Sequence, residues 1–430
     1  MLKKILKKKS NLVKIANQII LRFATLFFGL LISRVLISNL PTEVYVKYSL
    51  FTDSINNLVL LIISLSIPQI IQKYYTNYTL ESEIMKSGKL WTTMWAVRMG
   101  SYFFGLVVAC LIFFTVQITN SNFPFNLANI STLVGLYTVQ YLLVVDNSFR
   151  GIYDATGRGW IFNFTDAISK GCLAILLFSL SLVIKSDDFI NTFIAVGLLA
   201  YTLSNLMDYY FNRHYIRWGK IDWNIIFENR SLIFNVSLSS IFIYFYTFSF
   251  QYIFTLNSID SYQIANFSNA YNRVFISLLS VLSFVFSQYS TKLKVAYDQK
   301  NTVAIASIWR LVIMFSIGYF LFAQLAGRLV LYFLDSKNLY PDSVGLFQIL
   351  CFGLLFYPVN IMLTNFFIFV NKDKYEFVNS LVLAILGSIA IFTMSKFYGV
   401  TGAAIALVGL AFVEFLIRLY LYFKIKKFLL

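Results

Sequence analysis

The sequence predicts an all-α polytopic membrane protein, with about 12 transmembrane helices in two six-helix lobes around a central cavity. Three observations support this fold class: an apolar composition, apolar stretches repeated along the chain, and an uneven distribution of positive charge. Of the 430 residues, 59% are hydrophobic and 18% aromatic, only 13% are charged, and the mean hydropathy is +0.72. Soluble globular proteins of this length are much less apolar, so a helical membrane protein is expected.

Twelve apolar stretches are long enough to cross the hydrocarbon layer as helices. They cover approximately residues 17–38, 45–72, 91–116, 127–148, 164–184, 188–210, 231–254, 262–288, 304–326, 343–370, 376–397 and 399–422. Pro358 lies inside the tenth stretch, where the missing amide hydrogen of proline is expected to bend the helix.

The net charge of +16 tests this count, because lysine and arginine concentrate in the cytoplasmic loops of membrane proteins. If the N-terminus is cytoplasmic, nearly all loop lysines and arginines fall in the cytoplasmic segments. The exceptions are Lys47, Lys185, Arg328, Lys337 and Lys396. The charge therefore indicates membrane orientation, not nucleic-acid binding. The prediction is a multi-pass protein of the bacterial cytoplasmic (inner) membrane with both termini in the cytoplasm.

The loops divide the chain into five parts: a basic N-terminal segment (1–16), an N-terminal six-helix lobe (17–210), a cytoplasmic linker (211–230), a C-terminal six-helix lobe (231–422) and a basic tail (423–430). The two lobes also show weak internal similarity. Glu43 and Tyr45 match Asp260 and Tyr262 at an offset of 217, and the segment 157–163 matches 373–379 at an offset of 216. Transporters with parallel repeats of this kind bind substrate between the two halves.

The stretch 266–287 carries the clearest candidate site, a polar stripe on an apolar helix. At about 100° per residue, six polar residues fall within about 80° of one another. They are Asn266, Asn269, Arg273, Ser277, Ser280 and Ser287. An arginine at mid-bilayer depth costs at least about 2.5–3.5 kcal/mol on insertion scales, so it normally faces protein or a wet cavity. Arg273 therefore either lines a cationic cavity or bonds the asparagines of neighbouring helices.

Two further helices carry polar residues that could face the same cavity. The stretch 17–38 has a stripe of Gln18, Arg22, Thr25, Gly29 and Ser33, although Arg22 could instead extend to the lipid headgroups. The stretch 45–72 carries Ser49, Thr52, Asp53 and Asn56. By the offset of 217, Asn56 corresponds to Arg273. Asp53 could pair with Arg22 or Arg34, or could meet solvent.

The remaining charges inside the apolar stretches have simpler interpretations. Arg98 and Arg310 begin their helices from the cytoplasmic side and are expected to extend to the headgroups. Glu414 and Arg418 are four residues apart and are expected to form an ion pair. Asp166 and Lys170 have the same spacing, which fits either a local pair or a place in the cavity.

The sequence shows no constellation that would support catalysis, a cofactor or a metal. The only histidine, His214, lies in a basic loop without a cluster of Cys or Glu around it. The acidic pair at 187–188 lies in a short loop, and there is no phosphate-binding Gly-rich loop. The three cysteines lie in apolar stretches without metal-ligand spacing. We therefore expect a protein that binds and moves a substrate, without an enzymatic step, a cofactor or a metal.

Several short motifs, in order, resemble one known family. Tyr340-Pro-Asp-Ser343 is followed by the basic turn 371–375, and the segment 398–406 reads YGVTGAAIA. In the first half, Pro41 precedes Tyr45 and Tyr48, and Lys73-Tyr74 follows the second helix. This pattern resembles the polysaccharide transporter (Wzx-type) flippases of the multidrug/oligosaccharidyl-lipid/polysaccharide exporter superfamily. Val46 stands where the family usually has glycine, and Lys73 stands where it often has arginine.

The resemblance implies transport of an undecaprenyl-diphosphate-linked oligosaccharide to the outer leaflet, for O-antigen, capsule or exopolysaccharide synthesis. The family's cavity lies between its helices 1, 2, 7 and 8, and two of these, helices 1 and 8, carry the polar stripes here. Arg273 and Arg22 would bind the diphosphate, and the other candidates would bind sugars or line the cavity: Asn266, Asn269, Ser277, Gln18, Thr25, Asp53 and Asn56. Expected partners are the lipid-linked oligosaccharide, membrane lipids, and a glycan polymerase with its chain-length machinery. The alternatives are a cation-coupled multidrug or small-molecule antiporter of the same fold, and a membrane-embedded glycan polymerase or ligase.

Overall fold

In the computed structural model, the regular secondary structure of the described residues is helical, and these residues contain no strand. It describes residues 2–64, 67–68, 70–71, 84–119, 130–156, 158–184, 189–247, 250–335, 338–370 and 372–429. The side chains of residues 2–19, including Gln18, and that of Ser287 lie outside this description, as do Lys73, Tyr74 and the acidic pair 187–188. An all-helical fold is what a chain in lipid requires, because each helix satisfies its own backbone hydrogen bonds.

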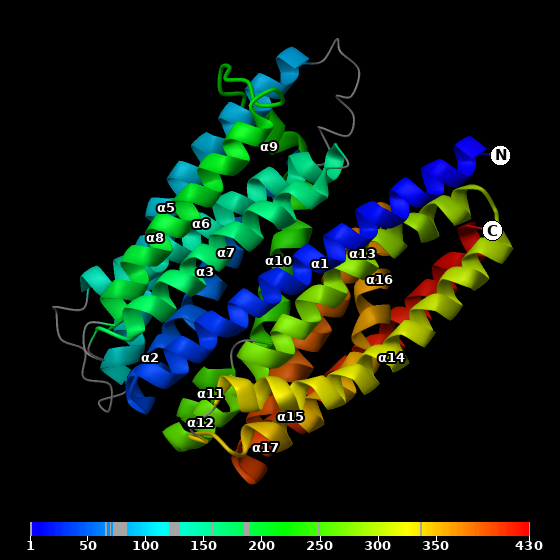
Figure 1. Ribbon diagram of the computed structural model, residues 1–430. Coiled ribbons are helices and arrows are strands. Elements are labelled where there is room, and N and C mark those ends of the chain that lie inside the picture. The colour runs from blue at the N-terminus through cyan, green and yellow to red at the C-terminus, as the bar shows by residue number, and fades with distance from the viewer. Residues whose placement is uncertain are drawn as a thin grey trace. The chain divides into compact units, whose positions relative to one another are not determined.

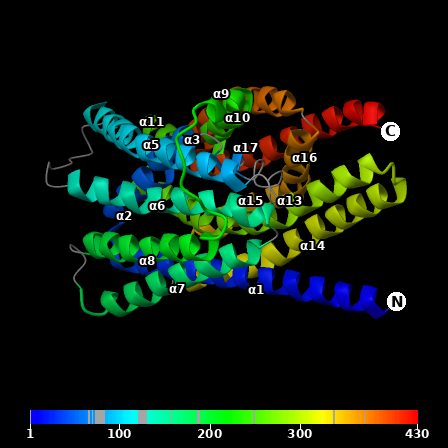
Figure 2. The same cartoon turned by 90° about the horizontal axis from the view of Figure 1, so that it is seen from above.

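The chain divides into two compact units. Unit 1 comprises Met1–Pro41 and Ile55–Phe234. Its helices are α1 (Leu2–Asn39), α3 (Asn57–Ser64), α5 (Ile84–Thr119), α6 (Ile130–Ala155), α7 (Gly159–Ser181), α8 (Phe189–Asn212) and the short α9 (Asn224–Glu228). Within this unit α7 packs on both α1 and α8, and α6 packs on α8 (Figures 1 and 2).

Unit 2 comprises Thr42–Ser54 and Asn235–Leu430. Its elements are α2 (Thr42–Ser49), most of the π-helical segment η1 (Leu50–Asn56), most of α10 (Arg230–Thr247), α11 (Phe250–Leu256), α12 (Ser261–Ser268), the π-helical η5 (Asn269–Phe275), α13 (Ile276–Asp298), α14 (Thr302–Leu334), α15 (Ser343–Cys351), the 3-10 helix η6 (Phe352–Leu355), α16 (Tyr357–Phe369) and α17 (Asp373–Leu429). In this unit α13 packs on α14 and α16, and α2 packs on α12.

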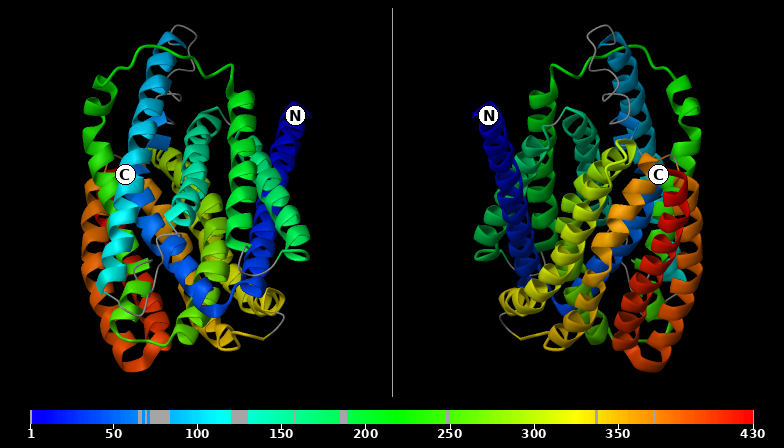
Figure 3. Two further views of the ribbon diagram at one scale, coloured as in Figure 1. Left: turned by 90° about the vertical axis from the view of Figure 1, so that its left-hand side faces the viewer. Right: turned by 90° about the vertical axis from the view of Figure 1, so that its right-hand side faces the viewer.

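The segment α17 consists of two arms joined by a sharp turn at Gly399, and the arms run side by side (Figure 3). Gly399 has a φ of +59°, in the left-handed region that a residue with a Cβ atom adopts at a cost. Gly402 follows one turn later, and a Cβ atom there would lie 2.1 Å from the carbonyl oxygen of Met394. The two glycines of the YGVTGAA motif thus allow the second arm to start close against the end of the first.

Helices occupy all twelve predicted stretches within the described residues. Judged by length and hydropathy alone, seven helices in the described part of the chain could cross a membrane, and a bent pair would make an eighth. The number is lower than twelve partly because both arms of α17 count as one span, Lys374–Lys426. The bent pair joins Ser343–Leu355 to Tyr357–Phe367 at 45°, directly before Pro358, as the sequence predicted.

The helix bounds give a direct alignment of the two repeats. The elements α2, η1 and α3 begin at residues 42, 50 and 57, and α12, η5 and α13 begin at 261, 269 and 276, which is 219 residues later in each case. The predicted offset of 217 was therefore two residues short. The position equivalent to Asn56 is Phe275, and Arg273 aligns with Ser54.

Arg98 departs from its predicted position. We expected it to extend to the headgroups, but its residue is only 3% exposed in unit 1. Its Nε donates to Ser148 at 3.1 Å, and its own carbonyl accepts a short hydrogen bond from Tyr141. The helix α5 begins earlier than predicted, at Ile84, so Arg98 lies four turns inside it and is covered by α6.

Candidate functional site

An ion pair between Arg273 of η5 and Asp53 of η1 forms a polar site in unit 2. The Nη2 atom of Arg273 lies 2.9 Å from Asp53 Oδ2, and both side chains are mostly buried, at 12% and 14% exposure. The two residues come from π-helical segments, which are rare and are often found at functional sites. A charge-assisted hydrogen bond of this length in a largely dry setting is strong.

Among the described residues, Asp53 also accepts hydrogen bonds from Ser49 of α2, Thr52 of η1 and Asn272 of η5. Ser49 donates to Asp53 Oδ2 at 2.6 Å and Thr52 donates to Oδ1 at 3.3 Å. Asn272 donates to Oδ2 at 3.2 Å from the neighbouring π-helical segment. The carboxylate thus keeps several hydrogen bonds even without the guanidinium, so its loss of contact with Arg273 would not leave it unpaired.

Two tyrosines of α2, Tyr45 and Tyr48, pack beside the Arg273 guanidinium. Tyr45 Oη accepts from Arg273 Nε at 3.2 Å, and the guanidinium carbon lies 5.7 Å from the ring centroids of both Tyr45 and Tyr48. Tyr340, in the loop after α14, stacks on Tyr45 with 6.1 Å between ring centroids. Burial raises the pKa of the Tyr340 hydroxyl, which therefore stays a neutral donor toward Thr42.

The Nη1 atom of the Arg273 guanidinium is a hydrogen-bond donor that neither Asp53 nor Tyr45 uses. The Nε and Nη2 atoms are engaged by Tyr45 and Asp53, whereas Nη1 has no hydrogen-bond partner among the described residues and is not fully buried. A planar guanidinium with an open edge is suited to receive an oxygen of an anionic group.

The other candidates on α12, η5 and α13 have separate surroundings. Asn266 is buried, donates to Tyr262 O at 3.0 Å and accepts from Ser343 Oγ at 3.3 Å. Asn269 is fully buried, and neither amide atom has a partner among the described residues. Ser277 is half-buried one turn beyond Arg273. The structure therefore brings together Arg273 and Asp53, a pairing that the sequence analysis did not consider.

The candidates in unit 1 do not form one site. Arg22 of α1 lies 3.7 Å from Asp166 of α7, and Lys170 lies 3.1 Å from the same carboxylate. The Thr25 hydroxyl is buried without a hydrogen-bond partner among the described residues, and so are both amide atoms of Asn56. The predicted local pair of Asp166 and Lys170 is present, with Arg22 as its third member.

Sequence reasoning missed Asn272, which bridges Asp53 and Ser268. The predicted polar stripe assumes a turn of about 100° per residue. The segment η5 is π-helical and turns less per residue, so the side chains after Asn269 point in other directions than the stripe predicted. The adjacent pair Asn272-Arg273 in an apolar stretch was the available signal. Tyr45 and Tyr48 appeared only as family-like residues, although the structure places both against Arg273.

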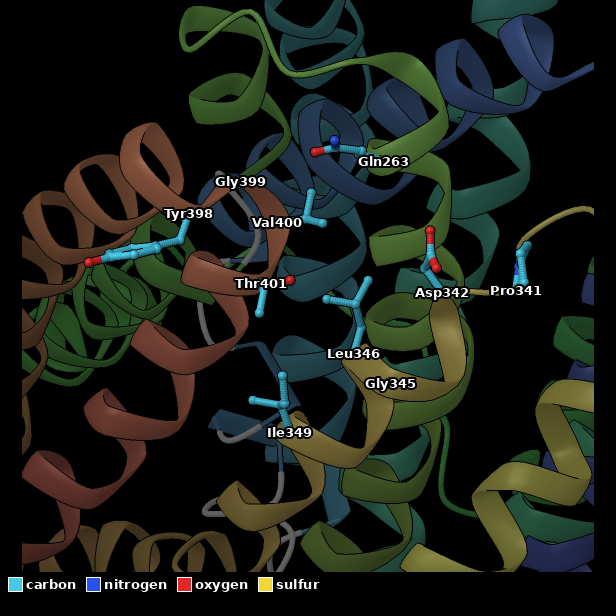
Figure 4. Close-up of a pocket in the computed structure, with 10 residues that line it drawn as sticks. All are labelled: Gln263, Pro341, Asp342, Gly345, Leu346, Ile349, Tyr398, Gly399, Val400 and Thr401. Atoms are coloured by element: carbon cyan, nitrogen blue, oxygen red, sulfur yellow. The ribbon is translucent and has the colours of Figure 1, made fainter.

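A pocket of about 610 Å3 opens elsewhere in unit 2, beside the turn of α17. Figure 4 shows Leu346, Ile349 and Thr401 pointing toward its interior, while the ring of Tyr398 points away. None of the nine residues predicted as site residues lines this pocket. It is therefore a separate feature from the ion pair.

No protein-family model matches the sequence, and a comparison with curated proteins finds no match either. Solved structures do match over nearly the whole chain. An inward-facing multidrug resistance MATE family transporter of the MOP superfamily has a TM-score of 0.77 and 13% identity, covering 96% of this chain and 98% of the other. The chain has the fold of the MATE transporters. A MOP superfamily transporter from Pyrococcus furiosus has a TM-score of 0.71 and 12% identity, covering 97% and 95%. A eukaryotic MATE transporter has a TM-score of 0.65 and 14% identity, covering 97% and 96%.

The fold agreement confirms the predicted fold class and indicates a multi-pass membrane protein. The compared proteins are themselves described as transporters. At 12–14% identity the agreement concerns the fold alone. The substrate must be inferred from the residues of this chain.

Proposed function

We propose that the protein is a flippase that moves a polyprenyl (undecaprenyl) diphosphate-linked oligosaccharide across the bacterial cytoplasmic membrane by alternating access. The observation that carries the proposal is the mostly buried guanidinium of Arg273, whose Nη1 atom has no hydrogen-bond partner among the described residues. A buried arginine in a transporter is expensive, and the anionic headgroup of a lipid-linked sugar would justify that cost. The polyprenyl tail would remain in lipid.

In this proposal the cargo replaces Asp53 as the partner of Arg273. A diphosphate oxygen first bonds the open Nη1 and then competes with Asp53 for Nη2. Asp53 keeps its bonds from Ser49 and Asn272, so it can move away without losing all of its donors. Asn269 of the same unit, whose amide group has no partner among the described residues, would bond a sugar hydroxyl in a state that opens its surroundings.

A second candidate is a multidrug or small-molecule antiporter. Two observations favour it: the compared structures include a multidrug resistance MATE transporter, and the site contains the carboxylate of Asp53, which could bind a cationic compound. One compared transporter is described as having a binding pocket of reversed polarity that suggests a different function. In the present chain the arginine is the group with the open donor, which favours an anionic cargo.

The experiment that tests the proposal is a flipping assay in proteoliposomes with a fluorescent prenyl-diphosphate-linked sugar. We expect Arg273→Ala to lose most of the flipping activity while Arg310→Ala retains it, because Arg310 is an exposed arginine of α14. Both variants must insert and elute like the parent protein. Full flipping by Arg273→Ala would contradict the proposal. Export of a cationic dye that depends on Asp53 but not on Arg273 would instead identify an antiporter.

The remaining expectations concern the cellular setting. A lipid-linked oligosaccharide flipped to the outer leaflet would pass to a glycan polymerase with its chain-length machinery. Membrane lipids would contact the exposed apolar side chains, such as Leu325 and Leu329 of α14, which are 75% and 72% exposed. An inner-membrane location with both termini in the cytoplasm can be checked by reporter fusions at residues 1 and 430.

A further inference from the structure

The pocket beside the turn of α17 has no part in the function proposed above. The first turns of α12 and α15 and the turn of α17 line it, and these three elements pack against one another. All of its lining residues belong to unit 2. Its volume of about 610 Å3 falls within the range of roughly 300–1,000 Å3 that small-molecule sites have. Unit 2 alone therefore forms a pocket that is large enough for a small ligand.

Contacts between the three elements fix the walls of this pocket. Ser343 Oγ, at the start of α15, donates to the carbonyl oxygen of Asn266 in α12 at 3.1 Å. A Cβ atom on Gly399 would lie 3.1 Å from Oε1 of Gln263, so the amide of this α12 residue lies close to the turn of α17. The positive φ of Gly399 allows that turn. The pocket therefore exists before a ligand binds, and little ordering is needed on binding.

Three polar side chains line the pocket, one from each element. They are Gln263 of α12, Asp342 beside α15 and Thr401 of α17, and all three are exposed. Within the described part of the chain, none of these side chains forms a hydrogen bond or an ion pair. Figure 4 shows Asp342 on the α15 side of the pocket and Thr401 on the α17 side. A carboxylate, an amide and a hydroxyl group are thus available to a ligand without breaking a bond of the protein.

An apolar surface lies beside these polar groups. Leu346 and Val400 are 4% and 8% exposed, and Figure 4 shows Leu346 and Ile349 pointing toward the interior of the pocket. Gly345 adds no side chain, and nothing lies within 4 Å of its Cβ position. A flat apolar face of a ligand can therefore approach the backbone of α15 at Gly345 while the edge of the ligand meets the polar groups.

The charge and chemistry of the lining limit the class of ligand. The lining contains one carboxylate, that of Asp342, and no lysine, arginine or histidine, so it repels phosphate and carboxylate groups. One carboxylate is too few for a calcium or magnesium site, and the described residues contain no group of three potential metal ligands. A carboxylate accepts hydrogen bonds from hydroxyl groups, whereas an amide and a hydroxyl both donate and accept. A neutral sugar fits this set, because its hydroxyl groups surround a ring with apolar C–H faces.

We propose that this pocket is a binding site for an uncharged sugar residue. Asp342 and Gln263 bond the hydroxyl groups of the sugar, Thr401 bonds it from the opposite wall, and Leu346 contacts the ring. The orientation predicted from the loop charges places the turn of α17 on the outer side of the membrane, where a flipped oligosaccharide would arrive. The identity of this sugar as part of the cargo rests on the proposed function, whereas sugar binding itself does not.

The test is saturation-transfer NMR of the purified full-length protein in lipid nanodiscs, with free glucose, N-acetylglucosamine and glucuronate as probes. We expect transfer to at least one of the two neutral sugars, and at least fivefold less to glucuronate, which Asp342 repels. Asp342→Asn should remove this discrimination. Gly345→Trp should fill the pocket and abolish the signal. Its matched control is Gly318→Trp, because Gly318 also has nothing within 4 Å of its Cβ position but does not line the pocket.

The parent protein alone can overturn the proposal, even if Gly345→Trp does not fold. Absence of transfer to both neutral sugars would do so, and so would equal transfer to glucose and glucuronate. An undiminished signal in folded Gly345→Trp would place the sugar elsewhere.

The flippase proposal fails or stands separately. Arg273→Ala should still bind the free sugar, because Arg273 does not line the pocket. Sugar binding by a protein that flips no lipid keeps the pocket assignment and removes the flippase. Normal flipping by Gly345→Trp that has lost sugar binding keeps both and removes the link between them.

Discussion

Replacing Asp53 by asparagine should strengthen the binding of a diphosphate at Arg273. In the free protein Asp53 Oδ2 occupies Nη2 of Arg273 at 2.9 Å, and an incoming anion has to compete with it. A hydrogen bond to a charged group contributes about 1.5–3 kcal/mol. The asparagine side chain keeps an acceptor oxygen and loses the charge, so the gain should be near the lower end. That corresponds to roughly tenfold tighter binding, since each 1.4 kcal/mol is a factor of ten.

The assay is calorimetric binding of a short-chain prenyl diphosphate to protein in nanodiscs, with the uncharged prenyl alcohol as the ligand control. Asp222→Asn removes one surface carboxylate and should leave the affinity unchanged. In an Arg273→Gln background the effect of Asp53→Asn should disappear, because the two residues act on one contact. Unchanged or weaker binding by Asp53→Asn would refute the idea that Asp53 and the cargo compete for the same guanidinium.

Three further predictions concern stability. Gly399→Ala should lower the free energy of unfolding by about 1–2 kcal/mol, because a φ of +59° is costly for a residue with a Cβ atom. The control Gly345→Ala should be nearly neutral, because nothing lies within 4 Å of the Cβ position there. Scanning fluorimetry of the two variants distinguishes them. Arg418→Met should destabilise the protein by about 3–5 kcal/mol by leaving Glu376 and Glu414 without their cation, and a melting temperature equal to that of the parent would contradict this. Arg98→Met should be neutral or stabilising by about 1–4 kcal/mol, because both terminal nitrogens of Arg98 are buried without hydrogen-bond partners among the described residues; a large loss of stability would contradict this.

The sequence predicted the fold class well because its signals are physical and strong. Apolar stretches of span length must be helical in lipid, and the Glu414–Arg418 and Asp166–Lys170 pairs follow from a spacing of four on a helix. Arg273 was singled out from the sequence as a costly residue in an apolar stretch. Its partner was not found, because a partner 220 residues away depends on tertiary packing, and local spacing carries no information about it.

Two further misses have distinct causes. The π-helical segments η1 and η5 change the helical phase, so the wheel did not place Asn272 beside Asp53. The buried carboxyl group of Asp208 accepts hydrogen bonds from Tyr153 and Thr165 on two other helices, and the aspartate alone resembles an ordinary polar residue near a helix end. Neither feature has a local signature in a single sequence.

The contact between Ser49 and Ser268 joins equivalent positions of the two repeats, 219 residues apart, at 2.7 Å. In two identical halves, a residue that meets its own counterpart would meet an identical copy of itself. Serine tolerates such self-pairing, since a hydroxyl both donates and accepts. Aspartate does not, and one turn further the counterpart of Asp53 is Asn272, which donates to it. Equivalent positions within one chain can carry different residues, so an asymmetric charged site is possible where two identical halves would place aspartate against aspartate.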